Sequence, residues 1–476
     1  MGRLLPLAFL ILVVPTAIML AVLTPPGQVA DESAHGFRVE ALAHGQLVGH
    51  RQPIVWTDGT TRIVAGVNTD VAAIHAAFPP LGGPVRGITA AELAQKRAVA
   101  WSGTRPFVEI SPLAVYPPLF YAPAALGMAV AEAAGAGPFD AQIAARLMNV
   151  LAFATLGLLA LLWTRRGQAL LFCTLSVPMT VSLAASLSQD GLLIAAAVLG
   201  VALLTRPHRD QHPWRDAAFW AGIAVLGCVT LTKLPYAGLL ALALLPLGGP
   251  GRPWAMRAAA VALAVLPALA WTAATMAFVA ASSPRLPAPP GPLWPGDPTV
   301  LFTGPNAAAQ LRVLWAAPLR LVQLPWDNIR HDPWLIKQGI GLLGWLDLIL
   351  PQWLYRSWAA AIGCAAMADT IGTRRAALRI GPAGTALLAL AAAAMVVAIY
   401  QSQYLTWTPV GAAAIEGPSG RYWLPLMPLL AAAIPRWPAA PLAMPLRTAL
   451  SAAPAAMALA SLITVPALIV LTYYVR

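Results

Sequence analysis

Apolar runs of about 20 residues recur along this chain, and few charges interrupt them. A helix needs about 20 apolar residues to cross the hydrocarbon layer of a bilayer. Only 10% of the residues are charged and 59% are hydrophobic, whereas a soluble domain has about 25% charged residues. We therefore predict an all-α polytopic integral membrane protein, with residues 1–476 forming a single transmembrane domain.

About eleven apolar segments are predicted to be transmembrane helices. They cover residues 4–24, 142–163, 167–185, 190–205, 214–232, 234–248, 255–281, 351–369, 381–401, 421–435 and 450–473. Two long polar stretches, residues 25–113 and 282–350, are predicted to be extracytoplasmic loops. The first apolar run is longer than a secretory signal core of about 7–15 residues, so we interpret it as a retained first helix.

The basic residues predict the orientation of these helices. Arginines cluster in the short loops, for example at Arg165–Arg166, at Arg374–Arg375 and at Arg436. Because cytoplasmic loops collect Lys and Arg, we place these loops and the N-terminus on the cytoplasmic side of the membrane. These clusters account for most of the net charge of +12. No basic stripe interleaved with aromatic residues, as in nucleic-acid-binding proteins, is present.

The apolar stretch 118–134 does not fit this topology as a full crossing, because every later arginine cluster would then change sides. It contains Pro123 and Gly127 and follows Tyr116-Pro117-Pro118. We therefore predict a re-entrant or interfacial helix on the outer face, where irregular backbone needs cover from protein or water. A normal span with an imperfect charge rule is the alternative.

The predicted topology also collects ionisable side chains on the outer face. They are Asp31, Glu32, His35, Arg146, Asp190, Lys233, Asp347 and Arg421. Ionisable groups close to a bilayer are costly and often functional. The plain alternatives are a solvated loop for the acids and snorkelling toward lipid headgroups for the bases. Any chemistry of this chain is therefore expected on its extracytoplasmic side.

Several motifs along the chain resemble the bacterial domain-of-unknown-function family 2142, and the resemblance covers almost the whole length. The motifs are Pro25-Pro26-Gly27-Gln28 with Asp31-Glu32 and Ala34-His35, then Tyr116-Pro117-Pro118, Ala145-Arg146-Leu147-Met148-Asn149, Ser188-Gln189-Asp190, Gly344-Trp345-Leu346-Asp347 and Gly420-Arg421-Tyr422-Trp423. That family looks like a branch of the GT-C glycosyltransferase superfamily, which includes protein O-mannosyltransferases and lipid A aminoarabinose transferases. The resemblance implies a GT-C-like fold and a site on the periplasmic face.

The resemblance also implies a reaction in which a sugar moves from a polyprenyl-phosphate donor to a glycan, glycolipid or protein acceptor. A carboxylate suits the general base that such a reaction needs. Asp31 is our first candidate for the base and Glu32 the second, and Asp190 falls on the second acidic position of the superfamily.

Basic side chains are needed to hold the leaving phosphate. Arg421 is the best candidate, because a guanidinium grips two phosphate oxygens at once. Lys233 is the second candidate and Arg146 the third. His35 would share a helix face with Asp31. Asp347 either caps the following helix or contributes to the site.

A divalent metal, Mg or Mn, is a candidate cofactor, since Asp190 offers the oxygen ligands that such ions prefer. Membrane lipids are expected as further partners.

Two other functions stay open at this point. A transporter or flippase of lipid-linked glycans should carry its charges near the bilayer midplane, and a non-catalytic assembly subunit needs no converging charges at all.

Overall fold

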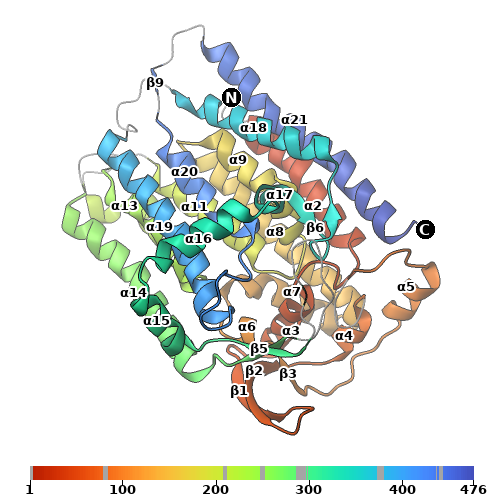
Figure 1. Cartoon of the computed structure of the whole chain (residues 1–476). Coiled ribbons are helices and arrows are strands. Elements are labelled where there is room, and N and C mark those ends of the chain that lie inside the picture. The colour runs from red at the N-terminus through yellow and green to blue at the C-terminus, as the bar shows by residue number, and fades with distance from the viewer. Residues whose placement is uncertain are drawn as a thin grey trace.

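The structure is a computed structural model of the whole chain, and it is mostly helical (Figure 1). It describes residues 4–78, 84–206, 212–246, 252–285, 296, 299–372, 380–435, 437–438 and 443–475. Of the arginines that predict the orientation, Arg374, Arg375 and Arg436 lie outside the described residues.

Five helices among the described residues are long and apolar enough to cross a membrane. They are Leu4–Leu23, which comprises α1 (Leu4–Ala8), η1 (Phe9–Val13) and α2 (Val14–Leu23); α8 (Pro138–Trp163); α14 (Trp254–Phe278); α19 (Pro382–Thr406); and Pro445–Tyr473 within α21 (Ala443–Tyr473). The chain is thus a helical protein with several candidate membrane spans. The remaining predicted segments are also helical but are shorter, broken or less apolar.

Three of the predicted segments are not single continuous α-helices. The segment 167–185 separates into α9 (Gln168–Ser176) and α10 (Pro178–Ala184), because Pro178 has no N–H to continue the helical ladder. The other two are η4 (Leu234–Leu240) followed by α13 (Ala241–Leu244), and η6 (Gly420–Leu426) followed by α20 (Met427–Ala433). Mean hydropathy does not register a break inside an apolar run, so the number of crossings stays a prediction.

Helix α11 (Asp190–Leu204) is the centre of the bundle, and all of its residues are buried. It packs against α8, α12 (Ala217–Thr232), α10 and α20, and its sequence is apolar on every face. A helix that is hydrophobic all round is stable only when it is enclosed. Its N-terminal residue, Asp190, is therefore held in a fixed position by the packing of the bundle.

The first long polar stretch, residues 25–113, folds in its described part into a layer at one end of the bundle (Figure 1). Its elements are α3 (Glu32–Ala43), β1 (His50–Val55), β2 (Thr61–Asn68), α4 (Ala72–Ala76), α5 (Ala90–Arg97), β3 (Phe107–Glu109) and α6 (Ser111–Ala114). The three strands form an antiparallel sheet in the order β1-β2-β3, with Gly66 opposite Glu109. This sheet is an addition to the predicted all-α fold.

The stretch 118–134 forms η2 (Leu119–Tyr121) and α7 (Ala122–Ala133), which packs along α8. Twelve residues extend about 18 Å, whereas the hydrocarbon layer is about 30 Å thick. Helix α7 is therefore too short for a full crossing by itself. Whether it is re-entrant or interfacial stays a prediction.

The second long polar stretch, residues 282–350, carries helices and short hairpins in its described part. They are β4 (Ser283–Arg285), β5 (Leu301–Thr303), α15 (Ala307–Ala316), α16 (Arg320–His331), α17 (Leu335–Gly341), β6 (Leu342–Leu343) and β7 (Leu348–Ile349). The remaining elements are η3 (Pro213–Arg215), α18 (Gln352–Thr370) and the parallel pair β8 (Ile371–Gly372) and β9 (Trp437–Pro438). Helix α17 packs against η6 and thereby supports the residues that follow Ser419.

Candidate active site

The backbone of Asp31 is in the left-handed region, with φ of 64°. Asp31 is the N-cap residue of α3 and ends the loop that follows the first helix. Among non-glycine residues, Asp and Asn adopt this conformation most readily, but it still costs free energy and is enriched at functional sites. The turn separates the side chains of two neighbouring acids, Asp31 and Glu32, into different surroundings.

Asp31 pairs with Arg421, although 390 positions separate the two residues in the chain. An Arg421 Nη donates to Asp31 Oδ2 over 2.8 Å. The Asp31 side chain is 51% exposed, whereas that of Arg421 is only 10% exposed. Burial alone would raise the pKa of Asp31, but the charge and hydrogen bond of Arg421 outweigh burial and lower it. The carboxylate is therefore ionised and reachable, beside a largely buried cation.

Arg421 is fixed in place by the residue before it, Gly420. A Cβ atom at Gly420 would lie 2.0 Å from the carbonyl oxygen of Leu335, so no larger side chain fits there. The N–H of Gly420 also donates to Gln338 Oε1 over 2.6 Å. These contacts fix the start of η6 against α17. They therefore also fix the position from which Arg421 reaches Asp31.

A second ion pair joins Lys233 and Asp190. Lys233 Nζ donates to Asp190 Oδ1 over 2.6 Å, and both side chains are mostly buried. Lys233 also lies 5.1 Å from the ring centre of Tyr422 and 5.8 Å from that of Tyr116, within the range of cation–π attraction. Arg421 lies 5.4 Å from the same Tyr422 ring, so this tyrosine links the two cations.

His35 completes the set. Its Nδ1 lies 2.7 Å from the hydroxyl of Tyr121, and its side chain is buried in α3. Burial lowers the pKa of His35 to about 4, although the negative charges of Asp190 and Asp31 act in the opposite direction. The imidazole is therefore neutral at pH 7. Its electrostatic coupling to both acids and both bases places all five groups in one cluster.

Glu32 and Arg146 pair with each other in the protein interior, away from this cluster. Arg146 Nε donates to Glu32 Oε1 over 2.8 Å and an Nη donates to Oε2 over 2.5 Å, with both side chains almost fully buried. The Glu32 carboxylate also accepts from the N–H groups of Leu187 and Gly27, each over 3.1 Å. Both Glu32 oxygens thus have hydrogen-bond partners, which favours a structural role for Glu32 and Arg146. Their predicted roles as a second base and as a phosphate ligand stay predictions.

Asp347 lies in the turn between β6 and β7 and forms an ion pair with Arg86. Its Oδ1 accepts from the N–H of Trp345 over 2.8 Å, which stabilises the turn. Trp345 Nε1 in turn donates to Gly27 O over 2.7 Å. Asp347 therefore supports the loop before Asp31 and has no direct bond to the cluster, which agrees better with a structural role than with a place in the site.

A family model described as "Predicted membrane protein (DUF2142)" matches residues 14–430. The chain belongs to this family. The matched range includes Asp31, His35, Asp190, Lys233 and Arg421, so all five residues of the cluster lie within the DUF2142 region. Comparisons of the chain with curated proteins and with solved structures find no match.

Four tyrosines around the cluster of this DUF2142 protein were not predicted from sequence. Tyr116 and Tyr422 flank Lys233, Tyr121 contacts His35, and the Tyr236 hydroxyl donates to the carbonyl of Tyr422 over 3.0 Å. Three of them are in or beside the motifs that carry the family resemblance. Sequence reasoning missed them because aromatic residues in a membrane protein are usually assigned to the interfacial belt.

The cluster offers no evident metal site. Among the described residues, no group of three or more His, Cys, Asp and Glu side chains could hold a metal ion. Asp190, the candidate ligand, is bonded to Lys233 instead. What the arrangement can do is hold an anion between two cations and accept a proton at a reachable carboxylate.

Proposed function

We propose that this protein is a GT-C-like glycosyltransferase of the bacterial inner membrane that uses a polyprenyl-phosphate sugar as donor. The acceptor is a hydroxyl of a glycan, glycolipid or protein on the periplasmic side. The observation that carries the proposal is the Asp31–Arg421 pair, in which a reachable carboxylate lies beside a largely buried guanidinium. A base and a phosphate ligand side by side are what glycosyl transfer from a phosphate leaving group requires.

In the proposed reaction, Asp31 takes the proton from the acceptor hydroxyl as the acceptor oxygen bonds to the anomeric carbon. The bond between that carbon and the phosphate oxygen breaks, and the phosphate leaves with the electron pair. Arg421 stabilises the charge on the leaving phosphate, and Lys233, which lies near the same Tyr422 ring, adds a second positive charge. His35 is neutral and supplies a hydrogen-bonding group rather than a charge.

Binding of the donor would itself make Asp31 a stronger base. Arg421 lowers the pKa of Asp31 in the empty site, and a carboxylate with a lowered pKa is a weak base. A phosphate that binds Arg421 competes with Asp31 for the guanidinium, so the pKa of Asp31 rises toward the value that burial favours. The base would therefore gain strength when a donor is present.

The location of the charges supports transfer rather than transport. Asp31 caps the start of α3, Asp190 begins α11 and Lys233 ends α12, so the charged groups lie at the ends of helices. In a flippase or transporter these charges should lie near the bilayer midplane, whereas we place them at the extracytoplasmic surface of the membrane.

The test is to compare the wild type with Asp31→Asn in the native host, with Asp58→Asn, an exposed acid at a hairpin tip, as the control. Mass spectrometry would follow surface glycans and the lipid-linked sugar pool, and membrane levels of each protein would be checked. We expect loss of one sugar from the glycan and accumulation of its polyprenyl-phosphate donor in Asp31→Asn alone. Unchanged glycans in Asp31→Asn, together with a defect in a deletion strain, would overturn the mechanism.

A further inference from the structure

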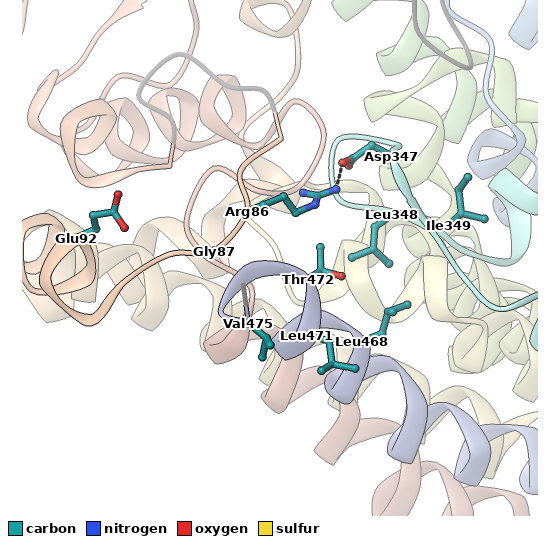
Figure 2. A pocket seen from close by; sticks show the side chains of 10 residues that line it. All are labelled: Arg86, Gly87, Glu92, Asp347, Leu348, Ile349, Leu468, Leu471, Thr472 and Val475. Atoms are coloured by element: carbon teal, nitrogen blue, oxygen red, sulfur yellow. Dashed lines mark hydrogen bonds and ion pairs between the residues drawn. The ribbon is translucent and has the colours of Figure 1, made fainter.

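A cavity of about 720 Å³ lies between the segment at Arg86, the β6–β7 turn and the end of α21 (Figure 2). We call it the Arg86 pocket, and the lining residues that matter here are Arg86, Asp347, Ile349, Leu468, Leu471 and Thr472. Its volume is within the range of about 300–1,000 Å³ that is usual for small-molecule sites. None of the roles proposed above uses this pocket.

One wall of the Arg86 pocket is apolar and comes from the last turns of α21. Leu468 and Leu471 belong to the candidate membrane span Pro445–Tyr473, and both line the cavity (Figure 2). Leu471 is 59% exposed. An exposed leucine at the end of a membrane span lies where lipid tails meet the headgroup region. This wall is therefore suited to a hydrocarbon chain.

The opposite rim is charged. The Arg86 side chain is 47% exposed, and one of its Nη atoms is bonded to Asp347. Thr472 of α21 lies between Arg86 and the leucines (Figure 2). Glu92, also near the rim, accepts hydrogen bonds from the N–H and hydroxyl of Thr89, each over 2.7 Å, and so serves as a helix cap. Arg86 is thus the cation of the pocket, with one carboxylate as its partner.

A cation and a hydroxyl above an apolar wall match an amphiphile with an anionic head. We propose that the Arg86 pocket binds the phosphate of a membrane lipid, with the lipid chain along Leu468 and Leu471. A guanidinium binds phosphate through two parallel hydrogen bonds. The phosphate takes the place of the Asp347 carboxylate on Arg86, so Asp347 competes with the ligand.

Chain neighbours of the lining residues are hydrogen-bonded to the loop before Asp31. Val85 N–H donates to Gln28 Oε1 over 3.0 Å, and the Tyr473 hydroxyl donates to Gln28 O over 3.3 Å. From the β6–β7 turn, Trp345 Nε1 donates to Gly27 O over 2.7 Å. A lipid in the pocket would therefore contact segments that are hydrogen-bonded to the backbone that positions Asp31. The inference holds whether or not the Asp31 site transfers sugars.

The test measures lipid binding to the purified full chain by native mass spectrometry. The probes are dioleoyl phosphatidic acid, a polyprenyl phosphate, dioleoylglycerol, which lacks the phosphate, and inorganic phosphate. The variants are Arg86→Gln and Asp347→Asn. Arg97→Gln is the matched control, since Arg97 is also a half-exposed arginine of the first long polar stretch that pairs with an acid, Asp140.

We expect Arg86→Gln to weaken binding of both lipid phosphates about tenfold or more, as loss of a charge-assisted hydrogen bond does. Asp347→Asn should tighten it, because the competing charge is gone while an oxygen that can accept from Trp345 is kept. If the Arg86–Asp347 pair were purely structural, both variants would change the lipid affinity in the same direction. Arg97→Gln should bind like the wild type. The preferred lipid phosphate identifies the source of the ligand.

Leu471→Gln provides a second variant at an exposed position that leaves the fold intact. It should weaken binding of the two lipids and leave binding of inorganic phosphate unchanged. The proposal is overturned if Arg86→Gln binds phosphatidic acid as the wild type does, if dioleoylglycerol binds equally well, or if inorganic phosphate binds as tightly as the lipids.

Discussion

Arg421 donates a hydrogen bond of 2.8 Å to Asp31, and the cation of this pair is the buried partner while the acid is the exposed one. An exposed salt bridge contributes little to stability, so stability does not explain why Arg421 is buried. The arrangement is instead suited to holding an incoming anion at a defined place, with a carboxylate next to it.

The shape of the Arg421 guanidinium should matter as much as its charge. Arg421→Lys keeps the charge but removes the planar fork, and we expect sugar transfer from a lipid-linked donor to fall about 100-fold. Transfer would be measured in isolated membranes with a radiolabelled donor. Arg97→Lys is the control and should transfer at the wild-type rate. A lysine variant as active as the wild type would show that only the charge matters.

Glu32 should act on stability rather than on chemistry. Glu32→Gln leaves Arg146 buried without its anion, and breaking a buried pair costs about 3–5 kcal/mol of unfolding free energy. Thermal unfolding in detergent should show a large decrease for Glu32→Gln and little change for Asp31→Asn. Asp140→Asn, in an exposed pair with Arg97, is the control. Equal stability of Glu32→Gln and the wild type would contradict the structural role.

The buried His35 should make stability depend on pH. Its pKa is about 4 in the folded protein and 6.5 in the unfolded chain. Between these values the unfolded state binds more protons, so the wild type loses stability as the pH falls from 6.5 to 4, by about 3 kcal/mol from this group. His35→Gln should flatten that part of the stability profile. His75→Gln, at an exposed position, should leave the profile as steep as in the wild type.

Gly420 should tolerate no side chain. Gly420→Ala would bring a Cβ atom against the Leu335 carbonyl, and η6 would have to move away from α17 together with Arg421. We expect loss of transfer and a lower melting temperature. Gly363→Ala is the matched control, because a Cβ atom there meets nothing within 4 Å. A fully active Gly420→Ala would mean that the position of Arg421 is not set by this contact.

The sequence was sufficient to predict a helical membrane protein and to bring Asp31, His35, Asp190, Lys233 and Arg421 to one side. Apolar runs and arginine placement carry that information. The sequence could not show which of Asp31 and Glu32 faces the cluster, because two adjacent acids look the same in a hydropathy pattern. Only the left-handed turn at Asp31 decides which acid faces the cluster.

Two other features also depend on contacts between distant segments. Residues of β1 are mostly polar or exposed and carry no strand pattern, and they pair with β2 because the layer around them folds. The partner of Asp347 is Arg86, 261 positions earlier in the chain. No spacing rule links such residues, so a cap was as plausible for Asp347 as a place in the site.

The pairing of Asp31 with Arg421 has a consequence for biosynthesis. During translation and membrane insertion, Lys233 emerges 43 residues after Asp190, and the two can pair while the ribosome is still at work. Asp31 has to wait for Arg421, 390 residues later. A chain halted before η6 could therefore already form the Lys233–Asp190 pair, while the carboxylate of Asp31 would still lack its arginine partner.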